Sequence, residues 1–185
     1  MTTLQVLTVC THNRTRSVLM KAILGEQLSL RGVAARLNSA GTFDHNQPPT
    51  EPTVRLLAKR GINVAPHRSS FVDDSAVADA DLIVTAEREH VVFISGRWDG
   101  SFSRTFTLPE LVIRGEAVGT RGDASISDWL ELVNHDRPRG MDYLNDDSVA
   151  EIVDPTGQAP AVWRDTIDEI DLLSRRLALL LLTRR

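Results

Sequence analysis

Hydrophobic residues follow two spacings along the chain: short runs of strand character, and longer segments of helical period. The runs predict four strands, at Leu4–Val9, Ala35–Ser39, Ala80–Thr85 and Arg104–Phe106. Helical spacing and helix-end residues predict helices at Ser17–Leu30, 50–61, Glu87–Ile94, Pro109–Ile113, Ser125–Val133 and Ala161–Leu182. The alternation predicts one α/β domain over residues 1–185, with a doubly wound, parallel, four-stranded sheet and helices on both faces.

The first predicted strand leads into Cys10, the only cysteine, and six polar residues from Thr11 to Arg16 follow it. In parallel sheets, ligands bind beyond the carboxyl ends of strands, where a loop leads into a helix. Such a loop can turn backbone N–H groups around an oxyanion, and Arg16 can return to bind two of its oxygens. The same surroundings favour a thiolate. A lone cysteine is more often a small buried hydrophobic residue, so it is the position of Cys10 that favours a phosphate-binding loop with a nucleophile.

The composition of the chain excludes several classes of partner and of site. The chain has 185 residues, 42% of them hydrophobic and 25% charged, with a net charge of −4 and a pI of about 5.7. This balance argues against nucleic acid or an anionic membrane as the main partner. A single cysteine excludes an internal disulfide and a zinc site of several thiolates, and we expect no metal or cofactor. The N-terminus lacks the pattern of a signal peptide, and the apolar run near the C-terminus is too short for a membrane span, so we expect a cytoplasmic protein.

Several ordered motifs resemble the low-molecular-weight protein tyrosine phosphatases. The signature V-C-x-x-N-x-x-R-S of that family corresponds to Val9–Ser17. The further motifs, in family order, are SAGT at Ser39–Thr42, PTEPTVRLLAKRGI at Pro49–Ile62, HRSS at His67–Ser70, DLIVTAERE at Asp81–Glu89 and VDP at Val153–Pro155. The resemblance covers most of the chain and implies that family's fold, with its phosphate-binding loop after the first strand.

The resemblance implies roles for three catalytic residues. Cys10 is the nucleophile that forms a phosphocysteine intermediate, and Arg16 binds the phosphoryl oxygens and stabilises the transition state. Asp154 is the general acid that protonates the leaving oxygen and later activates water. If Asp154 were only a turn residue of its Asp-Pro pair, Asp146 and Asp147 would be the nearest alternative acids.

The resemblance also implies how the loop is built. The substrate-binding residues are Thr11, His12, Asn13, Arg14, Thr15 and Ser17. Ser17 is expected to donate to the sulfur, and Asn13 is expected to join Ser39 and His67 in a buried polar network that holds a strained loop.

Three departures from the family concern the substrate. His12 stands where the family has a small residue, often glycine, and Arg14-Thr15 stands where it has apolar or small residues. Arg14 at the rim could favour acidic substrates, although an exposed, solvated charge is the simpler interpretation. After Asp-Pro the family commonly has an aromatic residue that walls the slot for a phenyl ring, and this chain has Thr156-Gly157.

The sequence therefore predicts a phosphomonoester hydrolase acting on a phosphotyrosine-containing protein or a small aryl phosphate. One alternative is an arsenate reductase, whose loop often reads Cys-x-His-Asn. With Cys10 as its only thiol, the chain would need an external small thiol for that reaction. The other alternative, a non-catalytic phosphopeptide or anion sensor, needs neither the thiolate nor the acid.

Overall fold

A parallel sheet of four strands, in the order β2-β1-β3-β4, forms the centre of the molecule. The computed structural model describes residues 3–43 and 46–183. The strands are β1 (Leu4–Cys10), β2 (Ala35–Gly41), β3 (Leu82–Thr85) and β4 (Thr105–Thr107). They confirm the four predicted strands. Because β1 lies between β2 and β3, the residues that follow these three strands meet at one edge of the sheet.

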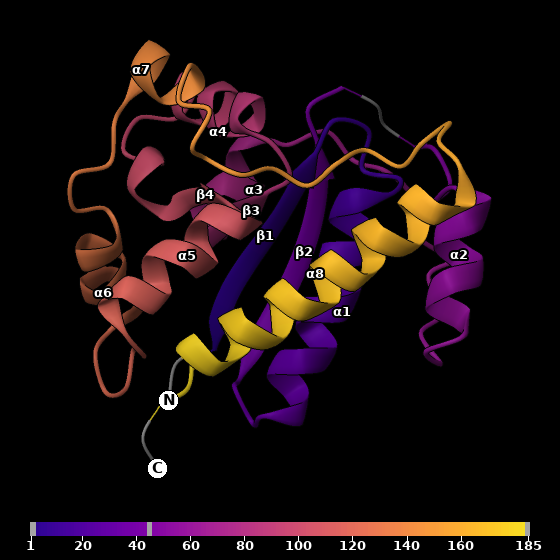
Figure 1. Cartoon of the computed structure of the whole chain (residues 1–185), viewed down its shortest axis with the longest axis horizontal. Helices are drawn as coiled ribbons and strands as arrows, with labels where there is room; N and C mark the ends of the chain where they lie inside the picture. The colour runs from indigo at the N-terminus through magenta and orange to yellow at the C-terminus, as the bar shows by residue number, and fades with distance from the viewer. Residues whose placement is uncertain (1–2, 44–45, 184–185) are drawn as a thin grey trace.

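Helices cover both faces of the sheet (Figure 1). One layer holds α1 (Arg16–Leu30), α5 (Leu108–Val118) and α8 (Pro160–Leu180), and the other holds α3 (Asp74–Asp79) and α4 (Arg88–Ser95). Val6 and Cys10 of β1 belong to the first layer. The alternate residues Leu7 and Val9 belong to the second layer, because successive side chains of a strand point to opposite faces. The doubly wound arrangement is confirmed.

The other elements are α2 (Glu51–Ala58), the 3₁₀ helix η1 (Phe102–Arg104), α6 (Ile126–Val133) and α7 (Gly140–Leu144). Sequence periodicity missed α3, η1 and α7, each of six residues or fewer, because so few residues carry no clear helical period. The Asp73 carboxylate caps α3 by accepting from the Ala76 N–H at 2.8 Å. Helix α5 continues to Val118, past its predicted end.

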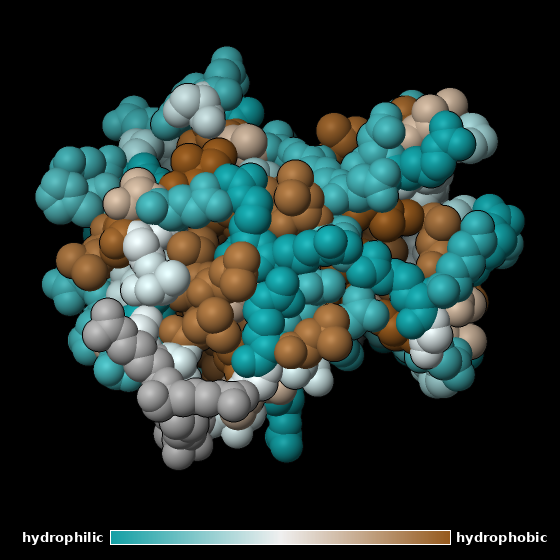
Figure 2. Space-filling model, turned by 60° about the horizontal axis from the view of Figure 1, so that its bottom comes forward, coloured by the Kyte–Doolittle hydropathy of each residue, from teal (hydrophilic) through white to brown (hydrophobic). Residues whose placement is uncertain are grey.

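Hydrophobic residues on the face seen in Figure 2 gather in groups that bands of hydrophilic residues separate. Exposed large hydrophobic residues of the last helices include Ile113, Leu132, Leu172 and Leu179. Within the described ranges, no helix has the length and apolar character that crossing a membrane requires.

Candidate active site

The loop after Cys10 is clamped from the neighbouring strand. Asn13 has a φ of 50°, a left-handed conformation that asparagine adopts more readily than most residues. The N–H of Thr42 donates to the carbonyls of Cys10 and Thr11 at 3.1 and 2.9 Å. A Cβ atom on Gly41 would lie 2.7 Å from the Thr11 carbonyl oxygen, so only glycine allows this close approach. The SAGT motif therefore supports the loop.

Backbone donors of the loop are available for a ligand. The N–H groups of Asn13, Arg14 and Thr15 donate to no other group in the part of the chain that the structure describes. The first N–H groups of α1, which begins at Arg16, also have no partner within their own helix. Such donors at a helix N-terminus favour a bound anion.

A chain of hydrogen bonds fixes the polarity of the contact at the sulfur. The Asn13 Oδ1 accepts from the Ser70 N–H at 3.0 Å, which orients the amide, and Asn13 Nδ2 donates to Ser17 Oγ at 2.9 Å. Because Ser17 Oγ already accepts this bond, its own proton can go to Cys10 Sγ, which lies 3.1 Å away. The contact expected between Ser17 and the sulfur is present, and all three of Cys10, Asn13 and Ser17 are buried.

The two supporting residues lie beside the loop in different ways. His67 Nε2 donates to the Asn13 carbonyl oxygen at 2.8 Å, and burial is the main reason that the pKa of His67 is lowered. The Ser39 hydroxyl has no hydrogen-bond partner among the described residues. Ser39 reaches the network only through its carbonyl, which accepts from the Ser70 hydroxyl at 3.3 Å.

Arg16 is buried, with 2% of its surface exposed, and is held by two carboxylates. Its Nη1 donates to the Ile152 carbonyl at 3.1 Å and lies 2.8 Å from Glu87 Oε1, and its Nη2 donates to Asp154 Oδ2 at 2.9 Å. Burial opposes the charge, but the hydrogen bond and charge of Glu87, and then the charge of Asp154, raise the Arg16 pKa. Sequence reasoning missed Glu87. Its place just after β3, at the same edge of the sheet as Cys10, was the available signal.

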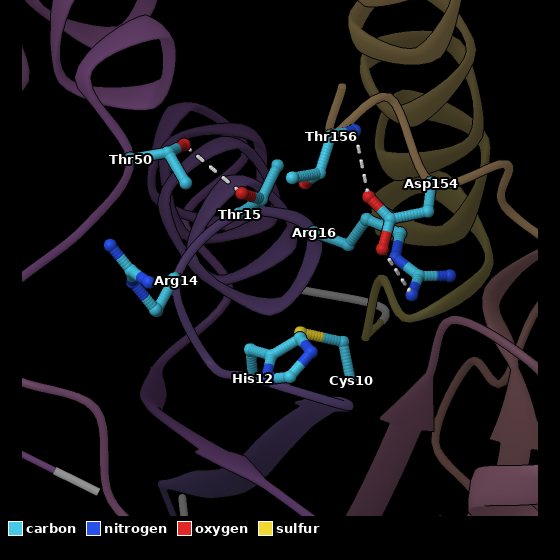
Figure 3. Close-up of a pocket in the computed structure, with 8 residues that line it drawn as sticks. All are labelled: Cys10, His12, Arg14, Thr15, Arg16, Thr50, Asp154 and Thr156. Carbon is cyan, nitrogen blue, oxygen red and sulfur yellow. Dashed lines mark hydrogen bonds and ion pairs between the residues drawn. The ribbon is translucent and has the colours of Figure 1, made fainter. Parts of the chain in front are cut away.

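Asp154 is the predicted acid that lies at the site. Its Oδ1 accepts from the Thr156 N–H at 2.9 Å, while its Oδ2 reaches Arg16, so the carboxylate is held from both sides (Figure 3). The Asp146 carboxylate instead binds Ser148, and Asp147 pairs with Arg88. Neither Asp146 nor Asp147 lines the pocket at Cys10.

His90, which sequence reasoning also missed, fixes the side chain of Thr11. The N–H of Glu87 donates to His90 Nδ1 at 3.1 Å, so the ring proton sits on Nε2 and is donated to Thr11 Oγ1 at 3.0 Å. Burial, followed by the charge of Arg16, lowers the pKa of His90 to about 4. The imidazole is therefore neutral near pH 7, and Thr11 binds this ring instead of lining the pocket.

A cavity of about 180 Å³ opens above Cys10. Its lining residues are Cys10, His12, Arg14, Thr15, Arg16, Thr50, Asp154 and Thr156. Of the eleven residues predicted for the site, this cavity brings together Cys10, His12, Arg14, Thr15, Arg16 and Asp154, and Thr11, Asn13, Ser17, Ser39 and His67 lie behind it. Thr50 is an addition from the N-cap of α2. No cluster of three or more His, Cys, Asp or Glu side chains suited to a metal ion occurs in the described ranges.

A thiol at the floor of an anion-binding loop, with an arginine and a carboxylate beside it, is the arrangement of a cysteine-based phosphatase. The sequence model of the low molecular weight phosphotyrosine protein phosphatases matches residues 5–108, and the chain belongs to this family. Its four-stranded parallel fold is that of the family's solved structures.

Three comparisons describe its relatives. A protein-arginine-phosphatase of Bacillus subtilis is 24% identical over 95% of both chains. EpsP of Ralstonia nicotianae, described as a probable low molecular weight protein-tyrosine-phosphatase, is 32% identical over 57% of this chain and 71% of its own. The solved structure of the YwlE arginine phosphatase from Geobacillus stearothermophilus is 25% identical, with a TM-score of 0.69 over 95% of this chain and 90% of that one.

Proposed function

We propose that this protein hydrolyses phosphotyrosine in proteins, and small aryl phosphates, through a phosphocysteine at Cys10. The observation that carries the proposal is the meeting of Cys10, Arg16 and Asp154 at one cavity of about 180 Å³. In the first step Cys10 Sγ attacks phosphorus, the bond to the leaving oxygen breaks, and Asp154 supplies the proton to that oxygen. In the second step the Asp154 carboxylate takes a proton from water, the water oxygen attacks phosphorus, and the S–P bond breaks to release phosphate and the thiolate.

The contacts of Arg16 support this sequence of events. Arg16 Nη2 binds Asp154 in the structure, and a phosphate dianion is a stronger competitor for a guanidinium than one carboxylate. Phosphate binding would draw Arg16 toward the loop and free Asp154 to reach the leaving oxygen. Glu87 and the Ile152 carbonyl would keep Nη1 in place during the exchange.

The whole chain, residues 1–185, is proposed to form one phosphatase domain. The family match ends at residue 108, yet Ile152 and Asp154 contact Arg16 from beyond it. Helix α8 packs against α1, the helix that begins with Arg16. A chain that ended at residue 108 would therefore lack its acid and a face of its core.

Hydrolysis of phosphoarginine is the second candidate. Relatives named as arginine phosphatases align over nearly the whole chain. The cavity also has threonine at positions 15, 50 and 156, and none of the described residues that line it is phenylalanine, tyrosine or tryptophan. The third candidate, arsenate reduction, would require an external thiol, because Cys10 is the only cysteine. A protein that only binds anions would not need the carboxylate of Asp154 at this cavity.

Turnover of an aryl phosphate, a phosphotyrosyl peptide and a phosphoarginyl peptide, measured without added thiol, tests these candidates. We expect release of phosphate from the first two substrates, and none from the Cys10→Ser variant. Release of phosphate from the phosphoarginyl peptide, and from neither of the other two substrates, would support hydrolysis of phosphoarginine. Arsenite formation that depends on an added thiol, without phosphate release, would support the third.

A further inference from the structure

The two arginines of the cavity differ in how their charges are compensated. Arg16 is paired with Glu87 and Asp154 at 2.8 and 2.9 Å. Arg14 Nε donates to the neutral carbonyl of Pro48 at 2.8 Å. No carboxylate of residues 3–43 or 46–183 forms an ion pair with Arg14. Arg14 therefore brings to the mouth of the cavity a positive charge that no described carboxylate compensates.

The chain holds Arg14 in this position. Its Nε bond to Pro48 orients the guanidinium, and its own carbonyl accepts from the Thr50 N–H at 3.1 Å. Next to it, the hydroxyls of Thr15 and Thr50 lie 3.0 Å apart. Contacts to one segment therefore fix both the backbone and the side chain, while the two terminal nitrogens of the guanidinium stay available as donors. A side chain held in this way loses less conformational entropy when it binds a ligand.

Arg14 and the Arg16–Asp154 pair lie on opposite sides of the pocket, with Cys10 between them (Figure 3). A peptide whose phosphoryl group sits at Cys10 must cross the rim of this pocket, and Arg14 is one of the residues that line it. The other residues that line the pocket are His12 and three threonines, so its rim is polar.

We infer that Arg14 is a specificity-determining residue that binds a second anionic group, the carboxylate of an acidic residue flanking the phosphotyrosine of a peptide. The inference rests on the proposed function of the same site. A guanidinium and a carboxylate form charge-assisted hydrogen bonds. The same arginine disfavours phosphoarginine, because the guanidinium of that substrate would approach a like charge.

The test compares two phosphotyrosyl peptides that differ only in Glu or Gln on both sides of the phosphotyrosine. The free energy of an exposed ion pair corresponds to a roughly two- to fivefold change in an equilibrium or rate constant. We therefore expect the wild-type kcat/KM for the Glu peptide to exceed that for the Gln peptide by about this factor at low salt. In Arg14→Gln the ratio should fall to about one. In Arg14→Lys, which keeps the charge but loses the planar fork, a ratio above one should remain. At about 1 M salt the Debye length is ~3 Å, so the wild-type preference should also weaken.

Arg36→Gln is the matched control. It removes the same charge from an exposed position of β2, at the end of the sheet away from the loop, and should keep the wild-type ratio. Turnover of both peptides by the wild type with a ratio of one would overturn the inference and leave the proposed function standing. A preference that survives in Arg14→Gln would overturn the assignment to Arg14. Absence of turnover on every phosphate ester would overturn the proposed function itself, and the inference with it.

Discussion

The carboxylate of Asp154 lies 2.9 Å from the guanidinium of Arg16, although 138 positions separate the two residues in the chain. Arg16 begins the helix that follows the loop, and Asp154 comes from the segment before α8. That segment is fixed by the bond from the Ile152 N–H to the Ala86 carbonyl at 2.8 Å. The bonds from Arg88 to Glu151 also hold it. Asp154, the proposed acid, is therefore in contact with Arg16, the residue proposed to bind the phosphoryl group.

Cys10→Ser should lose turnover and retain binding of phosphate. A serine hydroxyl without an adjacent base is a poor nucleophile, whereas Arg16 and the loop N–H groups remain as ligands for the anion. Turnover of an aryl phosphate and calorimetric binding of phosphate measure the two effects. In the wild type, phosphate should also slow the alkylation of Cys10 by iodoacetamide. Substantial turnover by the serine variant would exclude the thiol as the nucleophile.

Arg16→Lys should lose activity although it keeps a positive charge. Lysine replaces a planar fork by a point charge, so it loses the bidentate contact with two phosphate oxygens that a guanidinium can make beside Glu87 and the Ile152 carbonyl. Loss of one donor to a developing charge typically costs ~10²–10³ in kcat. Steady-state kinetics on an aryl phosphate test this, with the unfolding transition as a check that the variant folds. Activity within a few fold of the wild type would mean that Arg16 does not bind the transferred group.

Asp154→Asn should discriminate between leaving groups. Asparagine keeps the shape of the side chain but cannot supply a proton, and a positioned acid typically contributes ~10²–10⁴-fold. An electron-poor phenol can leave without a proton, so its phosphate ester should show little loss, whereas phosphotyrosine should lose most of its rate. Burst kinetics should be used, because they separate formation of the phosphocysteine from its hydrolysis. An equal loss on both substrates would identify Asp154 as structural.

His90→Gln should flatten the loss of stability in acid. The pKa of His90 is lowered from 6.5 to about 4, and at ~1.4 kcal/mol per unit this shift corresponds to about 3 kcal/mol. Between these pH values the unfolded chain binds the proton and the folded protein does not, so stability falls as the pH is lowered through this interval. Glutamine cannot titrate, and at the third position of a helix it can still accept from the N-cap N–H.

Urea denaturation of the wild type and His90→Gln, measured from pH 7 to pH 4, tests this prediction. The two free energies of unfolding should converge as the pH falls. The control is His135→Gln, which changes an exposed histidine that does not line the cavity and should follow the wild-type curve. Parallel curves for the wild type and His90→Gln would mean that His90 takes up its proton equally well in the folded and unfolded chains.

The sequence by itself determined the alternation of strands and helices and the position of the loop. The apolar run of β1, the polar residues after Cys10 and the helical spacing from Ser17 are local patterns, set by side chains within a few turns of one another. The resemblance to the family also implied that Asp154 is the general acid. Hydrophobic periodicity could not have predicted that Asp154 lies near Cys10. The signature predicted the contact of Ser17 with the sulfur.

Only the tertiary structure decided which distant groups surround these residues. Glu87, His90 and Thr50 reach the site because β3 ends, and α2 begins, at the same edge of the sheet as the loop after β1. The position of Glu87 just after β3 placed it at this edge, but no local pattern indicated that it, His90 or Thr50 would contact the loop. The direction of the Ser17 proton depends on the Ser70 N–H, which orients Asn13 from 57 positions away. Among residues 3–43 and 46–183, no carboxylate pairs with Arg14, whereas Arg16 has two, because the fold places Glu87 and Asp154 beside Arg16. Charge compensation depends on distances in space, and no spacing along the chain specifies them.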